Sequence, residues 1–188
     1  MKFKYLVRLT FIMVITVCLL ISCNYILENN TAKNRLSKES INRIQTNKEE
    51  ARLLVKAAKM NLDILELCEN IQNTNSDSNI IDLAESLEKT HLEISKNYNT
   101  VAMEKLISVP TYASEYIPTK NSATDETFTK STLKLILNKI NNQLKLLDTL
   151  ANISNKTEYK VLTIRDSFKL NSSKNKIENI LSELDKST

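Results

Sequence analysis

Glu88 and His91 have the spacing with which a helix presents two ligands to one metal ion. A three-residue step places both side chains on the same helix face, and di-iron carboxylate bundles use Glu-x-x-His in this way. A complete di-iron centre also needs a second such motif and two further glutamates. His91 is the only histidine in the chain, so the sequence excludes a complete site of this type.

A smaller, mononuclear site at the same place would take a third ligand from Asp63. If the first two predicted helices pair as a hairpin with its turn near residue 75, Glu88 lies level with Asp63, and His91 lies level with Asn61. The alternative is a buried or boundary histidine that hydrogen-bonds a neighbour such as Asn61, with Glu88 on the solvated flank. One histidine with two carboxylates gives little support for a metal, so we predict no metal and no cofactor.

Cys68 is the cysteine that could act as a nucleophile, provided that a base lies beside it. The hairpin register places Cys68 level with Leu83, eight residues from His91, which is about 12 Å along a helix. That separation exceeds hydrogen-bond reach, so a catalytic Cys-His pair is excluded. We expect Cys68 to be a small buried apolar residue, and we predict that the protein is not an enzyme.

The first 23 residues have the order of an export signal. Three basic residues, Lys2, Lys4 and Arg8, precede an apolar run of 13 residues that ends at Ile21, shorter than the roughly 20 of a membrane-spanning helix. The segment Leu20-Ile21-Ser22-Cys23 then resembles the lipobox of bacterial lipoprotein signal peptides. This resemblance implies a diacylglyceryl group on the Cys23 thiol, cleavage before Cys23 and acylation of the new amine. The alternative is an ordinary secretory signal.

Composition and charge exclude several classes of function. The chain has no glycine, so it cannot form a Walker phosphate loop, a dinucleotide-binding turn or a nucleophile elbow. Cleavage before Cys23 would remove three basic residues and no acidic ones, which lowers the formal net charge from +4 to +1. Because lysines and glutamates are interspersed in the remainder, we expect no nucleic-acid partner.

The chain is expected to have three parts: a lipoprotein signal peptide (1–22), a lipidated cysteine with a flexible tether (23–45), and a four-helix bundle (46–188). The tether is rich in Asn, Lys and Ser and would reach on the order of 25 Å. Thr46 and Glu49 have capping-box spacing, so we expect the first helix of the bundle to begin near Thr46, with Ile41 and Ile44 as residues that could extend it backwards.

Apolar residues recur in alternating steps of three and four over four segments, which predicts amphipathic helices at 46–73, 79–106, 125–152 and from 157 onward. The predicted core rows of the last three are Ile80, Ala84, Leu87, His91, Ile94, Tyr98 and Val101; Leu133, Leu137, Ile140, Leu144, Leu147 and Ala151; and Tyr159, Leu162, Asp166, Leu170, Ser173, Ile177, Ile180 and Leu184. Val161, Ile164 and Phe168 are expected to supply a flanking row in the last helix.

The segment 107–124 lacks helical periodicity and contains both prolines of the chain. Neighbouring bundle helices usually need only about 2–8 connecting residues, whereas this segment could reach about 60 Å, more than the roughly 40 Å of a 27-residue helix. We therefore predict an all-α, ferritin-like four-helix bundle with a long crossover between its second and third helices. Tyr112 and Tyr116 in the crossover either fix the loop on the bundle or serve a function.

Three segments carry a resemblance to a known family: Ala51 to Leu62 (ARLLVKAAKMNL), Glu88 to His91 (EKTH) and Ile107 to Thr111 (ISVPT). They resemble the helical domain of unknown function numbered forty-one forty-two, whose members are often labelled predicted outer-membrane proteins. The resemblance covers about 48–184 and implies a ferritin-like fold and an exported location, with no agreed activity. Members often place histidines in the third and fourth helices, where this chain has Ile140 and Ser173.

Together these patterns predict a lipid-anchored protein of the cell envelope, held on the outer membrane of a Gram-negative bacterium. We expect a non-catalytic binding or structural role, with the membrane as one partner and an envelope protein as a candidate second one. The alternatives are a ferritin-like metal-binding or redox protein that uses His91, Glu88 and Asp63, and a surface-exposed adhesin or host-interaction lipoprotein. The sequence determines neither the ligand nor the oligomeric state.

Overall fold

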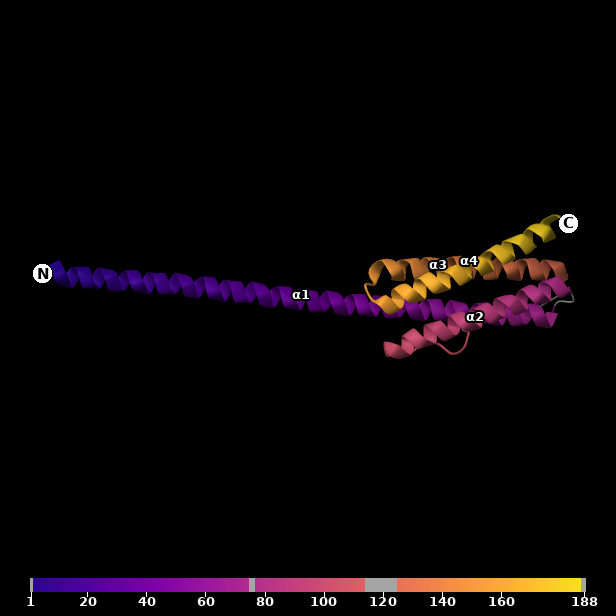
Figure 1. Ribbon diagram of the computed structural model, residues 1–188, viewed down its shortest axis with the longest axis horizontal. Helices are drawn as coiled ribbons and strands as arrows, with labels where there is room; N and C mark the ends of the chain where they lie inside the picture. Colours follow the sequence, from indigo (N-terminus) through magenta and orange to yellow (C-terminus); the bar gives the residue numbers. More distant parts are fainter. Residues whose placement is uncertain (1, 75–76, 114–124, 187–188) are drawn as a thin grey trace. The chain divides into compact units, whose positions relative to one another are not determined.

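The computed structural model describes residues 2–74, 77–113 and 125–186, with side chains from Lys38 onward except those of residues 125 and 126. The described residues form four α-helices and no strand (Figure 1), so the all-α four-helix prediction is confirmed. The helices are α1 (Lys2–Thr74), α2 (Ser78–Glu104), α3 (Asp125–Ile153) and α4 (Thr157–Lys186). The chain divides into two compact units, Met1–Gln45 and Thr46–Thr188.

The beginning of the first helix differs from the expectation. α1 begins at Lys2, so the predicted start at Thr46 is wrong, and residues 24–45 are helical where a flexible coil was expected. No proline occurs before Pro110 and the chain has no glycine, so nothing in this stretch breaks a helix. Glu49 lies inside α1 and accepts hydrogen bonds from the Arg52 guanidinium at 2.8 and 2.5 Å instead of capping a helix.

Within the residues that the structure describes, none of the helices combines the length and the apolar content that crossing a bilayer requires.

The ends of α2 are defined by local backbone chemistry. At its beginning the Asp77 side chain accepts a hydrogen bond from the Asn79 amide at 2.9 Å. At its end Leu106 has a φ of 56°, and the Ile107 amide donates to the Ala102 carbonyl at 2.8 Å. This is the Schellman arrangement, in which the left-handed residue is usually glycine. A chain without glycine places a leucine there.

The residues that pair between two helices show whether the helices run in the same or in opposite directions. Asn61 pairs with His91 and Gln72 with Glu88, so α2 runs antiparallel to α1. α3 also runs antiparallel to α1, because Lys139 contacts Asp63, and Gln143, further along α3, contacts the carbonyl of Ala57, which lies earlier in α1. α2 and α3 therefore run in the same direction.

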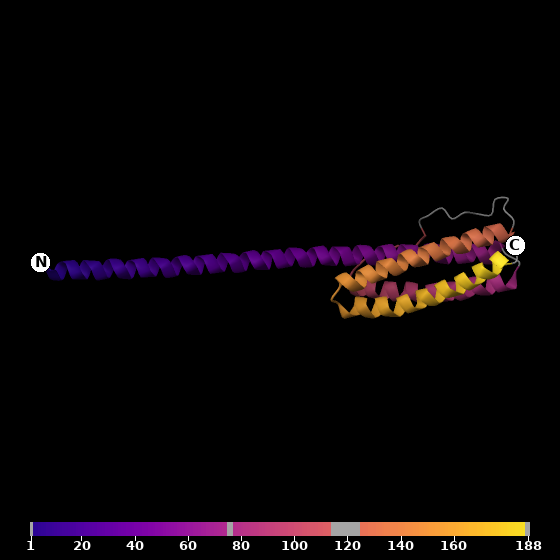
Figure 2. The same ribbon diagram turned by 90° about the horizontal axis from the view of Figure 1, so that it is seen from above.

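α4 completes the bundle beside α2 and α3. Asn97 bonds Asp166 and Ser86 bonds Lys176, so α4 runs antiparallel to α2, and an ion pair joins Lys130 of α3 to Asp185. Figures 1 and 2 show the three helices side by side with the C-terminal part of α1.

The core matches the predicted rows unevenly. Every residue of the predicted α2 row is buried. In α3 the buried face is rotated relative to the predicted row, since Leu137, Leu144 and Ala151 are only half-buried. The buried positions include Leu133, Ile136, Ile140, Gln143, Leu147 and Leu150. In α4 the predicted row is buried from Tyr159 to Ile177, while Ile180 and Leu184 are half-buried. The expected flanking row of Val161, Ile164 and Phe168 is wrong, because these side chains are exposed.

Candidate functional site

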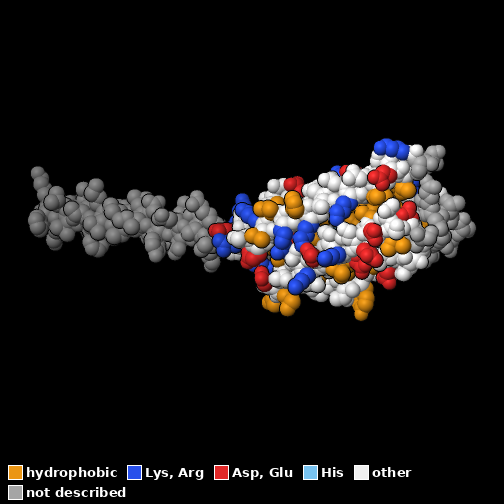
Figure 3. All heavy atoms as spheres, turned by 45° about the vertical axis from the view of Figure 1, so that its right-hand side comes forward, with side chains coloured by type: hydrophobic (Ala, Val, Ile, Leu, Met, Phe, Trp, Pro, Cys, Tyr) orange, Lys and Arg blue, Asp and Glu red, His pale blue; other side chains and the backbone are white. Residues whose placement is uncertain are grey.

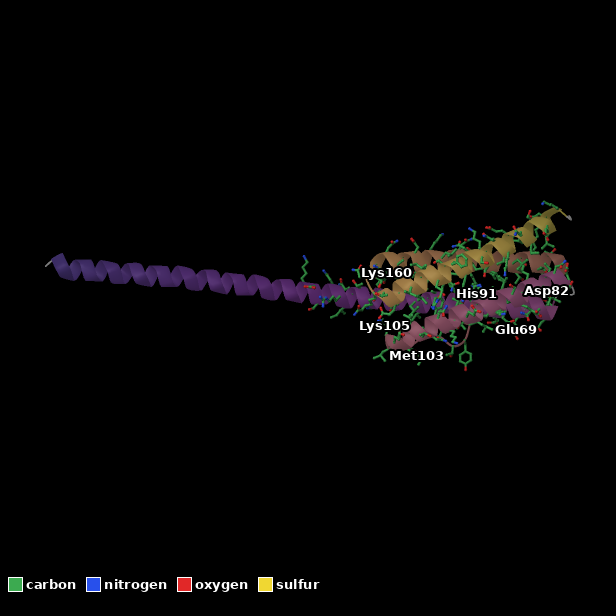
Figure 4. The ribbon with its side chains drawn as sticks, viewed as in Figure 1. Glu69, Asp82, His91, Met103, Lys105 and Lys160 are labelled. Atoms are coloured by element: carbon green, nitrogen blue, oxygen red, sulfur yellow. The ribbon has the colours of Figure 1, made fainter. Side chains whose placement is uncertain are left out.

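His91 lies fully buried near the middle of the bundle, between the ends marked by Glu69 and by Lys105 (Figure 4). The Asn61 side-chain amide donates to the His91 main-chain oxygen at 2.8 Å, so its Oδ1 faces the imidazole Nδ1 at 2.7 Å. Nδ1 therefore carries the proton and Nε2 is an acceptor. Burial lowers the pKa of His91 to about 3, so the ring is neutral. The predicted hydrogen bond between His91 and Asn61 is confirmed.

Gln143 is a second buried polar residue at the centre. Its side-chain nitrogen donates to the Tyr98 hydroxyl at 2.9 Å and to the Ala57 carbonyl at 3.2 Å, and so links α3 to α2 and α1. Burial, and after it the charge of Asp166, raises the pKa of Tyr98 well above its ordinary value, so the phenol is neutral. Gln143 therefore joins three helices through neutral hydrogen bonds.

Asp166 brings a carboxylate into the same region from α4. Its Oδ1 accepts from the Asn97 side chain at 2.7 Å and from the Arg165 Nε at 3.2 Å. Burial raises the pKa of Asp166, and the hydrogen bond from Asn97 and the charge of Arg165 oppose this shift. His91, Asn61, Gln143, Tyr98, Asn97 and Asp166 together form what we call the central polar cluster.

Two further carboxylates of α1 are buried and paired with lysines. Asp63 meets the Lys139 ammonium at 2.9 Å, with 3% of its side chain exposed. Glu50 meets Lys156, which follows α3 and also donates to the Asn47 side chain at 2.8 Å. Both pairs connect α1 to distant parts of the chain, and each neutralises a carboxylate that burial alone would disfavour.

In the structure each of the three proposed metal ligands contacts a different side chain. Asp63 is engaged by Lys139, Glu88 accepts from the Gln72 side chain at 2.7 Å, and His91 faces Asn61. Across the residues that the structure describes, no three His, Cys, Asp or Glu side chains lie close enough together to hold a metal ion. The positions at which the resemblance implies further histidines, Ile140 and Ser173, are both buried.

Cys68 is buried and forms no disulfide. Burial, and after it the charge of Glu88, raises the pKa of its thiol to about 12, so the thiol stays protonated near neutral pH. This agrees with the expectation of a buried, unreactive cysteine. Of the crossover tyrosines, Tyr112 is exposed and Tyr116 lies outside the described residues; Cys23 lies in α1 where side chains are not described.

Four buried polar atoms among the described side chains have no hydrogen-bond partner: Glu50 Oε1, His91 Nε2, Gln143 Oε1 and Asp166 Oδ2. One comes from each helix, and all four are acceptors once the His91 proton is placed on Nδ1. Three of these residues, His91, Gln143 and Asp166, belong to the central polar cluster. Five of its six residues are buried, while Asn97 is half-buried and lines a surface pocket.

A surface pocket of about 300 Å³ lies between the end of α2 and the beginning of α4. Its lining includes Asn97, Glu104, Glu158 and Arg165. The Lys105 ammonium contacts Glu158 at 2.5 Å, and the Arg165 Nε is engaged by Asp166. Acidic and basic groups meet there in similar number, so the pocket selects no ligand charge.

No protein-family model, no curated protein and no solved structure matches the chain. The resemblance to the domain of unknown function, and what it implies, therefore stays a prediction.

Sequence reasoning found His91 with its Asn61 partner and placed Asp166 on the buried face of α4. It missed Gln143, because the predicted α3 row passed through Leu144, one residue away. A glutamine is ordinarily solvent-exposed, and only its i±7 spacing with the buried Ile136 and Leu150 indicates an inward position.

Proposed function

We propose that this protein is a lipid-anchored component of the bacterial cell envelope that acts by binding or as a structural element, without catalysis. The observation that carries the proposal is the sequence Leu20-Ile21-Ser22-Cys23 directly after a basic and then apolar segment. Lipid attached at Cys23 would hold the chain on a bilayer, since two or three acyl chains suffice where one binds only marginally. The outer membrane of a Gram-negative bacterium is the proposed location.

A non-catalytic role agrees with the chemistry of the described residues. His91, Cys68 and Tyr98 are buried, and burial holds all three neutral near pH 7. The imidazole of His91 and the phenol of Tyr98 hydrogen-bond side chains of other helices, those of Asn61 and Gln143.

The surface charge supports the absence of a nucleic-acid partner. On the face shown in Figure 3, acidic and basic side chains are intermixed, with apolar side chains between them. A nucleic-acid-binding face would gather its basic residues together.

We propose a ferritin-like topology with a crossover for the bundle. Support comes from the helix directions, because α2 and α3 both run antiparallel to α1 and so parallel to each other. Two consecutive parallel helices need a connection that returns along the bundle. Residues 105–124 could extend to roughly 65 Å, which exceeds the length of the 27-residue α2, about 40 Å.

The anchor is tested by comparing Cys23→Ala with Cys18→Ala, a matched control that lies in the apolar run and leaves the four lipobox residues unchanged. Cells grown with labelled palmitate should attach label to the natural chain and to Cys18→Ala, but not to Cys23→Ala. Mass spectrometry of the natural chain should show a fragment that begins at a lipidated Cys23. Palmitate labelling of the Cys23→Ala variant equal to that of the control would contradict the anchor.

A further inference from the structure

Three apolar side chains on α4 point away from the bundle. Val161 is 53% exposed, Ile164 75% and Phe168 78%. The steps of three and four residues between them place all three on one face of the helix. We call these residues the α4 apolar stripe.

The stripe has no part in the core of its own bundle. Ile164 lies two residues from both Leu162 and Asp166, which are buried, and so points about 160° away from them. The outward face of a bundle helix is ordinarily polar. Three large apolar residues in one row there indicate a surface that another molecule covers.

Basic residues border the stripe on both sides. Lys160 follows one edge and Arg165 the other, as their angular positions on a helix require, whereas Lys169 is turned further toward α2, where it contacts Glu93. The only carboxylates between Thr157 and Asn171 are Glu158, which Lys105 contacts, and Asp166, which is buried. Arg165 keeps 45% of its side chain exposed although it contacts Asp166. The exposed charged side chains directly beside the stripe on α4 are therefore those of Lys160 and Arg165, both cationic, whereas the pocket at Val161 is also lined by Glu104 and Glu158.

We propose that the α4 apolar stripe is the face with which the bundle lies on a bilayer that contains anionic lipids. An interfacial helix has this composition: a narrow apolar row that enters the boundary between headgroups and acyl chains, with lysine and arginine beside it to meet lipid phosphates. The inference rests on the proposed lipid anchor, because an anchored domain meets the bilayer at high effective concentration. A weak contact is then sufficient.

The cationic borders disfavour a second copy of the chain as the occupant. A two-fold interface places the same surface on both partners, so stripe-to-stripe contact would bring Lys160 and Arg165 of one copy into the same interface as Lys160 and Arg165 of the other. Three side chains on a convex helix also offer little area for a protein interface, which usually needs more than about 1,000 Å². Shallow insertion into a lipid surface has no such requirement.

The chain contains no tryptophan, so Phe168→Trp introduces a single fluorescent reporter into the stripe. Leu92→Trp is the matched control: Leu92 is 53% exposed on α2 and is turned about 100–140° away from Glu93 and Asn97, which contact α4. Both variants are purified as full lipidated chains and reconstituted into vesicles of phosphatidylglycerol and phosphatidylethanolamine that carry brominated acyl chains.

Bromolipid should quench the tryptophan at 168 and shift its emission to the blue, and should leave the tryptophan at 92 unchanged. Ile164→Asn in the Phe168→Trp background should lower the ratio of docked to undocked bundle by about tenfold or more, since one buried aliphatic side chain is lost. Lys160→Glu, or vesicles of phosphatidylcholine alone, should weaken the quenching.

Two outcomes overturn the inference. One is a tryptophan at 168 that bromolipid does not quench and that aqueous iodide reaches as readily as the tryptophan at 92. The other is protection from iodide without bromolipid quenching, which would indicate a protein or a second copy on the stripe. Mass spectrometry of the same samples confirms the lipid on Cys23, so a failed anchor is distinguished from a failed docking face.

Discussion

Acid is expected to weaken the bundle through His91, the only histidine of the chain. Burial lowers its folded-state pKa from 6.5 to about 3. Between these values the unfolded chain binds a proton that the folded chain does not, so the free energy of unfolding falls as the pH falls below 6.5. The loss reaches roughly 2 kcal/mol by pH 5, a sizeable part of the roughly 5–15 kcal/mol of an ordinary domain.

His91→Asn is the variant that isolates this contribution. Its side-chain amide presents a donor near the position of Nδ1, so Asn61 keeps its partner, and the variant cannot titrate. The smaller side chain lowers stability by an amount that does not depend on pH. Urea unfolding at several pH values, followed by near-ultraviolet circular dichroism of the buried Tyr98 and Tyr159, measures packing of the bundle in both chains.

Other titrations affect both chains alike and cancel in the comparison. Glu49, Glu93, Glu158 and Asp185 are exposed carboxylates whose pKa their basic partners lower, so their contributions decline in acid. Asp166 has a raised pKa and therefore the opposite sign. The natural chain should lose about 2 kcal/mol more than His91→Asn between pH 7.5 and pH 5. Equal losses, or a ring proton that titrates near pH 6 by NMR, would refute the assignment.

Two further changes test particular contacts. Leu106→Gly should raise the free energy of unfolding by roughly 0.5–1 kcal/mol, because glycine adopts positive φ without strain and Leu106 is 95% exposed. The control, Met103→Gly in the last turn of α2, should lower the free energy of unfolding. A lower stability of Leu106→Gly in urea unfolding would contradict the Schellman assignment. Lys139→Leu should cost about 3 kcal/mol by leaving the buried Asp63 without its ammonium partner, and adding Asp63→Leu should recover most of that loss in a double-mutant cycle; simple additivity would show that the pair is not coupled.

Helix positions were predictable because their boundaries have local causes. α2 begins after Asp77, which caps it, and α3 and α4 are separated by the short segment 154–156. The exception is α1, where the capping-box spacing at Thr46 predicts a start, whereas the helix begins at Lys2. A capping box marks a helix end only where the preceding residues leave the helix. Residues 24–45 contain no glycine or proline that would make them do so.

Which face each helix buries was harder to predict. In α2 the apolar row is unambiguous, whereas in α3 the residues Leu135, Ile136 and Leu137 are all apolar. Periodicity within the helix alone cannot select among adjacent apolar residues, because the choice depends on how α1 and α4 pack against it. The pattern also predicts the wrong surroundings for the exposed stripe on α4, because an apolar row on a helix ordinarily faces the core.

The buried polar residues have a physical role that requires no ligand. A seam of leucines and isoleucines tolerates a shift of one helix along another, since one apolar side chain replaces another at similar cost. Such a shift is not tolerated by the buried hydrogen-bonded pairs, Asn61 with His91 and Gln143 with Tyr98. A shift by one turn would leave each buried polar group without its partner, which costs about 1–3 kcal/mol of stability per group. We therefore interpret the central polar cluster as the feature that fixes the register of the four helices, at some expense to the stability of the core.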